Sequence, residues 1–212
     1  MTATVNGVKA TGKEKLKFVL IKEGETEPEK PSNPEKSEVK VASVKLAKTS
    51  YVYDGKVKKP GIVAKNNKGE KITSKDYTVK YASGCKNVGT YTVKVTFKGD
   101  YKGTFTKTFN INPKGTSLSK VKAARKSFSA TWKKQSKQTS GYQVQYSTNK
   151  KFAKSVKTST ISKNTTVKKT VKKLSAKKTY YVRVRTYKNV KAGKKTVKLY
   201  SGWSKVKAVK TK

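Results

Sequence analysis

The sequence lacks several residue types that catalytic and metal sites commonly need. It contains no histidine and a single cysteine, Cys85, among 212 residues. Without histidine there is no Ser-His-Asp or Cys-His catalysis and no histidine-ligated zinc, and one cysteine makes neither an internal disulfide nor a four-thiolate site. No apolar run approaches the roughly 18–20 residues of a transmembrane helix. We therefore expect no metal, no cofactor, no transmembrane segment and no enzyme activity.

Acidic residues are also scarce, and they are distributed unevenly. Eleven Asp and Glu face 53 Lys and Arg, which gives a formal net charge of +42. Residues 1–38 are neutral, residues 39–113 carry +12, and residues 114–212 carry +30 without one acid. Lysine supplies almost all of the positive charge, and lysine suits a solvated surface better than it suits bidentate phosphate recognition. Non-specific affinity for polyanions at low salt is expected in any case.

The pattern along the chain predicts an all-β protein of two tandem Ig-like antiparallel β-sandwiches. Residues 1–22 form a short N-terminal β segment, a possible remnant of an upstream module, and residues 23–38 form a Pro/Glu-rich linker. From residue 39 apolar side chains recur at every second position, with turn sequences such as Asp54-Gly55 between the runs. This spacing predicts one sandwich over 39–113 and a second over 114–212.

The second unit resembles a fibronectin type III domain. The predicted strands are 120–123, 128–133, 141–147, 156–161, 165–174, 179–187 and 203–209, which include Trp132, Gly141-Tyr142-Gln143-Val144-Gln145-Tyr146 and Leu174 through Arg185. The resemblance implies that Tyr180 is the tyrosine corner and that Trp132 lies in the core. Ala176-Lys177 stands where Pro-Gly is common in that family. The Lys-rich style and Tyr200-Ser201-Gly202-Trp203-Ser204 are similar to domains of secreted proteins from Gram-positive gut anaerobes.

The first unit is similar to bacterial immunoglobulin-like repeats. The supporting sequences are Tyr53-Asp54-Gly55-Lys56, Lys59-Pro60, Asp76 through Tyr81, Asn87 through Tyr91 and Gly99 through Gly103. Both resemblances imply non-catalytic extracellular modules that space, display or bind. We expect a monomer at the cell surface or outside the cell. Because Lys17 interrupts a short apolar run, residues 1–22 make a poor signal peptide.

One surface is specific enough to nominate as a ligand site. Alternation along 179–187 places Tyr180, Val182 and Val184 inward and Tyr181, Arg183, Arg185 and Tyr187 outward. Gln143 and Gln145 are expected beside this row on the neighbouring strand, and Lys205 and Lys207 on the other side. The row could hold an anionic glycan or a wall-polymer phosphate by hydrogen bonds and stacking, or it could be a solvated sheet face without a ligand.

The other candidates have simpler interpretations. Asp54, Asp76 and Asp100 lie in turn sequences, where the side chain bonds its own backbone, rather than in a paired carboxylate site. Cys85 is either a turn residue or an exposed thiol, activated by Lys86, that bridges two chains. Trp203 either offers a sugar platform or covers the sheet edge with Tyr200.

Three functions remain open on the sequence. In the first, the chain is a spacer, display and adhesion module of a bacterial surface or secreted protein. Alternatively, it is a polyanion- or glycan-binding adhesin module that uses the Tyr/Arg row. In the third interpretation it is an accessory region of a larger secreted hydrolase whose enzyme domain lies upstream.

Overall fold

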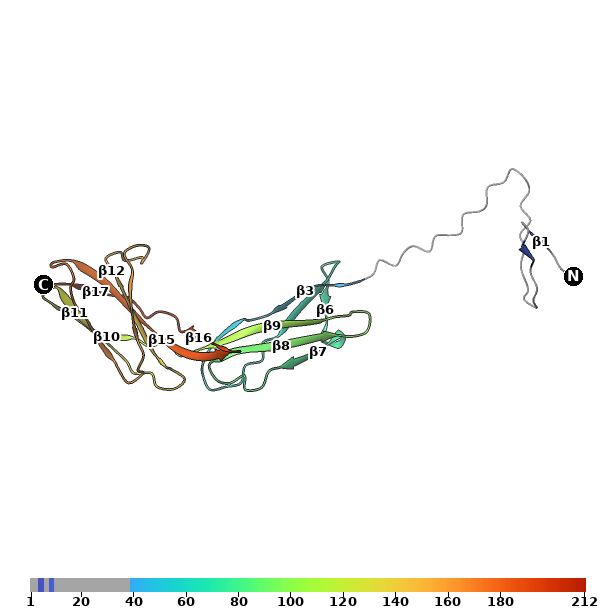
Figure 1. Cartoon of the computed structure of the whole chain (residues 1–212), viewed down its shortest axis with the longest axis horizontal. Helices are drawn as coiled ribbons and strands as arrows, with labels where there is room; N and C mark the ends of the chain where they lie inside the picture. The colour runs from blue at the N-terminus through green and yellow to red at the C-terminus, as the bar shows by residue number, and fades with distance from the viewer. Residues whose placement is uncertain (1–3, 6–7, 10–38) are drawn as a thin grey trace, which may run out of the picture. The chain divides into compact units, whose positions relative to one another are not determined.

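The computed structural model describes residues 4–5, 8–9 and 39–212 (Figure 1). Within 1–38 the described elements are β1 (Thr4–Val5) and β2 (Val8–Lys9), which pair antiparallel. The predicted linker 23–38 lies outside the described residues. Among the described residues, no helix is long and apolar enough to cross a membrane.

The first sandwich contains seven strands and one short 3-10 helix. They are β3 (Val41–Leu46), β4 (Ser50–Val52), β5 (Ile62–Asn66), β6 (Lys71–Ile72), η1 (Ser74–Asp76), β7 (Tyr77–Tyr81), β8 (Gly89–Phe97) and β9 (Thr104–Asn112). One sheet has the order β3-β5-β6 and the other β4-β9-β8-β7. The β4–β9 pair is parallel, whereas the sequence pattern predicted antiparallel pairing throughout.

The long hairpin β8–β9 shows why these residues form strands (Figure 1). In β8 the side chains of Val93, Val95 and Phe97 are buried, while Thr92, Lys94 and Thr96 between them are exposed. β-Branched residues at every second position favour a half-buried strand. The apolar face packs into a core that also contains Phe109 and Ile111.

The second sandwich contains eight strands. They are β10 (Leu118–Ala124), β11 (Ser127–Trp132), β12 (Gly141–Ser147), β13 (Lys157–Ile161), β14 (Lys168–Val171), β15 (Thr179–Ala192), β16 (Lys195–Tyr200) and β17 (Lys207–Lys210). One sheet has the order β10-β11-β14 and the other β13-β12-β15-β16, with β17 also paired to β15. The all-β fold is therefore confirmed, with Trp132, Tyr142, Val144, Val182 and Val184 in the core.

The tyrosine corner is confirmed at Tyr180. Its hydroxyl accepts a hydrogen bond from the backbone N–H of Ser175 at 3.2 Å, and its ring is buried. This bond ties the start of β15 to the turn before it, as expected for this fold. The turn closes with Ala176-Lys177 instead of Pro-Gly, and Lys177 adopts a φ of 49°.

One strand of the second sandwich was missed. The sequence pattern ended the long strand at Tyr187 and predicted the last strand over 203–209, whereas β15 continues to Ala192 and pairs with β16. The alternation of Lys195 through Tyr200 gave a weak signal, because these positions are all exposed or half-buried. Gly193 has a φ of 60°, which suits a two-residue hairpin turn.

Candidate functional site

The predicted Gln and Arg neighbours lie side by side on β12 and β15. The register places Gln145 opposite Arg183 and Gln143 opposite Arg185. Arg183 donates through Nε to Oε1 of Gln145 at 2.8 Å, and Arg185 donates through Nε to Oε1 of Gln143 at 3.0 Å. Hydrogen bonds with a charged donor are stronger than neutral ones. Each arginine therefore already has a fixed acceptor within the fold.

The two glutamines are also bonded on their other side. The amide nitrogen of Gln145 donates to Thr158 Oγ1 at 3.1 Å, and that of Gln143 donates to Thr160 Oγ1 at 3.2 Å. Two parallel Thr-Gln-Arg rows thus cross β13, β12 and β15. Each glutamine thus uses its oxygen and one of the two N–H donors of its amide within the sheet.

Aromatic rings cover the two guanidinium groups. The guanidinium carbon of Arg183 lies 3.9 Å from the Phe152 ring centroid and 4.6 Å from that of Trp203. The guanidinium carbon of Arg185 lies 4.3 Å from the Trp203 ring centroid and 3.8 Å from the Tyr200 ring centroid. These distances are within the range of cation–π attraction. We name the five residues the cation–π ladder: Phe152, Arg183, Trp203, Arg185 and Tyr200.

The segment that carries Trp203 is anchored to the edge of β15. The backbone N–H groups of Ser201 and Ser204 donate to the carbonyls of Thr186 and Val184. Their hydroxyls accept in return from the N–H groups of Thr186 and Val184, both at 3.0 Å. The spacing of these two serines around Gly202 and Trp203 therefore holds the indole over both arginines. Covering the sheet was one of the two interpretations given to Trp203.

Burial affects the pKa values of the two arginines in the ladder. Desolvation lowers the pKa of both Arg183 and Arg185 from the ordinary value of arginine. Both guanidinium groups remain cationic at neutral pH, because free arginine titrates above pH 12. Aromatic rings and a glutamine oxygen therefore stabilise each guanidinium cation within the fold, although these neutral groups leave its positive charge in place.

Tyr187 is not part of the exposed row, so its predicted position is wrong. Its side chain is 2% exposed. Thr186 before it is also buried, so the alternation of buried and exposed residues along β15 breaks at this point. It stacks at 6.1 Å from the Tyr200 ring and lies against Gly141, where a Cβ would approach its ring to 3.0 Å. Burial raises the pKa of Tyr187.

The other residues of the predicted site lie at different places around β17. Tyr181 is half-buried and pairs opposite Ala208 on β17. Lys205 is exposed ahead of β17. Lys207 pairs opposite the buried Val182, and its Nζ donates to the Ser119 carbonyl at 2.9 Å. Lys207 therefore points toward β10, away from the arginines, and the prediction that it extends the row is wrong because the register places it on the face of Val182.

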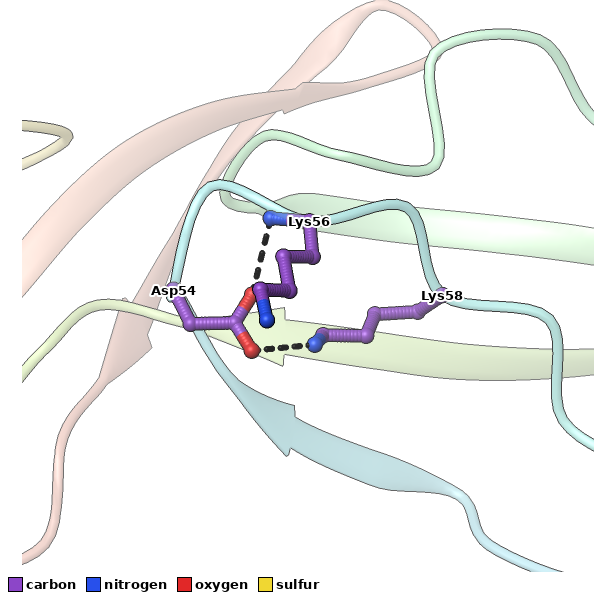
Figure 2. A network of polar contacts seen from close by, with 3 residues as sticks. All are labelled: Asp54, Lys56 and Lys58. Atoms are coloured by element: carbon purple, nitrogen blue, oxygen red, sulfur yellow. Dashed lines mark hydrogen bonds and ion pairs between the residues drawn. The ribbon is translucent and has the colours of Figure 1, made fainter.

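Asp54 and Asp76 act as turn residues. Asp54 Oδ1 accepts from the Lys56 backbone N–H at 2.9 Å, and its Oδ2 pairs with Lys58 Nζ (Figure 2). The bond from Lys58, followed by that from Lys56, lowers the pKa of Asp54. Asp76 accepts from Thr73 Oγ1 at 2.8 Å. Within the described part of the chain, no three potential metal ligands gather.

Cys85 is buried, which contradicts the exposed-thiol interpretation. Its side chain is 4% exposed in the first core, and Sγ donates to the Ala82 carbonyl at 3.0 Å. Desolvation raises the pKa of the thiol, so Lys86 does not activate it. Cys85 lies in a turn, as the other interpretation held, and the turn folds inward at this residue.

One family model and several solved structures match parts of the chain. Residues 112–201 match the family model of the fibronectin type III domain. No curated protein matches the chain. Three solved structures are similar to part of the chain.

The first is named "Myokine structure", at 18% identity, a TM-score of 0.33 and coverage of 45% of this chain and 90% of that one. The FN1-FN3 domains of chicken CNTN1 match at 15% identity and a TM-score of 0.40, over 81% and 67%. A beta-1,2-glucanase from Parabacteroides distasonis matches at 13% identity and a TM-score of 0.36, over 56% and 17%. From the family match and the observed sheets, the chain carries a fibronectin type III domain in tandem with an Ig-like β-sandwich.

Proposed function

We propose that the chain is an extracellular spacer, display and adhesion module of a bacterial surface or secreted protein. The observation that carries this is the contrast between its charged groups. The arginines of the nominated site are held within the fold by hydrogen bonds to glutamine and by stacking against aromatic rings. The second sandwich has no Asp or Glu to compensate its lysines. Attraction to anionic surroundings therefore rests on the lysines.

The alternative site on the Tyr/Arg row has weaker support. In each arginine, two of the five N–H donors go to a glutamine oxygen and Trp203 stacks on the guanidinium, which leaves fewer donors for an anion. This arrangement supports a stabilising role for the row. Among the described residues, no contact specifically supports the third interpretation, an accessory region of a larger hydrolase.

Adhesion is tested by cosedimentation with purified Gram-positive wall fragments at about 0.15 M salt, where the Debye length is about 8 Å. We expect binding to intact fragments and loss of binding after the anionic polymer is extracted. Equal binding to extracted fragments would overturn the adhesion part of the proposal.

Location is tested separately, in cells that produce the protein. Brief protease treatment of intact cells should release peptides of this chain, while a cytosolic enzyme in the same cells stays intact. Release only after lysis would overturn the extracellular location.

A further inference from the structure

The outer face of the sheet β10-β11-β14 is a lysine-bordered surface of hydroxyl groups. The register aligns Lys120, Thr131 and Lys168 in one row across the sheet, and Lys122, Ser129 and Thr170 in the next. Directly opposed residues share a face. The alternate positions Phe128, Ala130 and Val171 are buried, so these two rows face away from the core. We name these six residues the lysine–hydroxyl face.

The dimensions of the face suit an extended polymer. Neighbouring strands lie about 4.8 Å apart, so Lys120 on β10 and Lys168 on β14 are separated by about 10 Å across β11. Residues two apart on a strand repeat at about 6.7 Å, which is the spacing from Lys120 to Lys122 and from Ser129 to Thr131. A chain lying along β11 would thus run over hydroxyl groups with ammonium groups on both sides.

The charges on this face lack compensation inside the sandwich. Lys120, Lys122 and Lys168 are exposed, and residues 114–212 contain no Asp or Glu. The opposite sheet differs, because there the cation–π ladder covers the cations with rings. An anionic partner would gain counterion release from three lysines at once.

The side chains on the face also narrow the chemistry of the partner. No aromatic side chain lies in the two rows, so bases and sugar rings find no stacking platform. The cations are lysines, which act as point charges and lack the fork that reads base edges. Ser129 offers a hydroxyl group that donates to phosphate oxygens and accepts from polyol hydroxyls. The Thr131 hydroxyl donates to the Lys120 carbonyl at 3.3 Å, so it offers only its acceptor lone pairs to the polymer.

We propose that the lysine–hydroxyl face binds a linear polyol-phosphate polymer of the bacterial wall along β11. This inference rests on the proposed adhesive function and identifies the surface and the polymer class. The test titrates purified poly(glycerol phosphate) against the full chain at several salt concentrations. The face variant is Lys120→Gln with Lys122→Gln and Lys168→Gln.

The matched control removes the same charge elsewhere: Lys45→Gln with Lys71→Gln and Lys94→Gln, all exposed on strands of the first sandwich. Because each contact on a flexible chain contributes about 0.7 to the slope of log K against log salt, the face variant should lose about 2 from that slope. The control variant should keep the wild-type slope. Thermal melting of both variants checks that each remains folded.

The outcomes separate the two claims. If the wild-type chain fails to bind the polymer at about 0.15 M salt, the adhesive function and this inference both fail. If the wild type binds and the two variants lose the same slope, adhesion stands and the face is overturned. If single-stranded DNA of equal charge binds the wild type as tightly and loses as much with the face variant, the polyol-phosphate assignment is overturned.

Discussion

Two arginines determine how the nominated site should be understood at the scale of single residues. Arg183 and Arg185 were singled out as possible ligand groups because they stand in one outward row with aromatic neighbours. The predicted neighbours Gln143 and Gln145 do lie opposite the two arginines, whereas the predicted flanking residue Tyr187 is buried and Tyr200 stacks on Arg185 instead. The alternation rule could not foresee that Trp203, from a segment outside the sheet ladder, lies between the two guanidinium groups. Contacts of this kind depend on tertiary structure.

Gly141 gives a sharp prediction at the same scale. A Cβ at this position would lie 2.0 Å from the Ile161 carbonyl oxygen and 3.0 Å from the Tyr187 ring. Because a backbone oxygen cannot move aside cheaply, Gly141→Ala should cost about 2 kcal/mol or more of unfolding free energy. The measurement is urea denaturation. Gly202→Ala is the control, since a Cβ added there would meet no atom within 4 Å and stability should change little. Equal stability of the two variants would contradict the close packing at Gly141.

Cys85 provides a prediction about accessibility and pH. Burial raises its folded-state pKa above the ordinary value, so the folded state holds the thiol proton more tightly than the unfolded state does. The resulting stabilisation is complete below the ordinary pKa of about 8.5 and is lost as pH rises through the folded pKa. The native protein should react slowly with a disulfide reagent, and the protein unfolded in urea should react quickly. The stability of the native protein should also fall more steeply above pH 9 than the stability of Cys85→Ala. Rapid stoichiometric labelling in native buffer would show that the thiol is open.

At the scale of elements, the first sandwich contains two opposed lysines, and changing one of them to an acid turns their repulsion into attraction. Lys80 on β7 lies directly opposite Lys94 on β8, and both are exposed. Opposed like charges destabilise a sheet and opposite charges stabilise it by about 0.2–1 kcal/mol. Lys94→Glu should therefore raise the melting temperature, in a thermal denaturation at low salt. Lys45→Glu makes the same charge change opposite Val63 and serves as the control. A gain that is equal in both variants would indicate a net-charge effect.

Element boundaries mark where sequence patterns lose their power. Strands with buried Val, Phe or Tyr at every second position were predicted closely, for example Gly141–Ser147. β16 was missed because its outward and inward positions are both exposed or half-buried, so the alternation carries little contrast. Lys207 was misplaced for another reason, since the register of β17 pairs it with the buried Val182. Tyr187 was misplaced because the burial of two successive residues breaks the period of β15.

At the scale of the whole molecule, the net charge of +42 should govern stability as well as adhesion. Self-repulsion among lysines destabilises the compact state, and salt screens it as the Debye length falls from about 30 Å at 0.01 M to about 8 Å at 0.15 M. Scanning calorimetry should therefore give a melting temperature that rises with sodium chloride over this range. The variant with Lys45, Lys71 and Lys94 all changed to Gln should show a smaller rise. A melting temperature that falls with salt would mean that attractive pairs dominate.

The central claim is that the arginines stabilise the fold while the lysines carry the attraction to anionic polymer. The most direct test is the poly(glycerol phosphate) affinity of Arg183→Lys with Arg185→Lys at about 0.15 M salt, since this double variant keeps the charge and removes the planar fork. We predict wild-type affinity together with a loss of about 1–3 kcal/mol of unfolding free energy, as stacking and the bonds to glutamine are lost. A tenfold or greater loss of affinity in a variant of unchanged stability would contradict the account and assign ligand binding to the arginines.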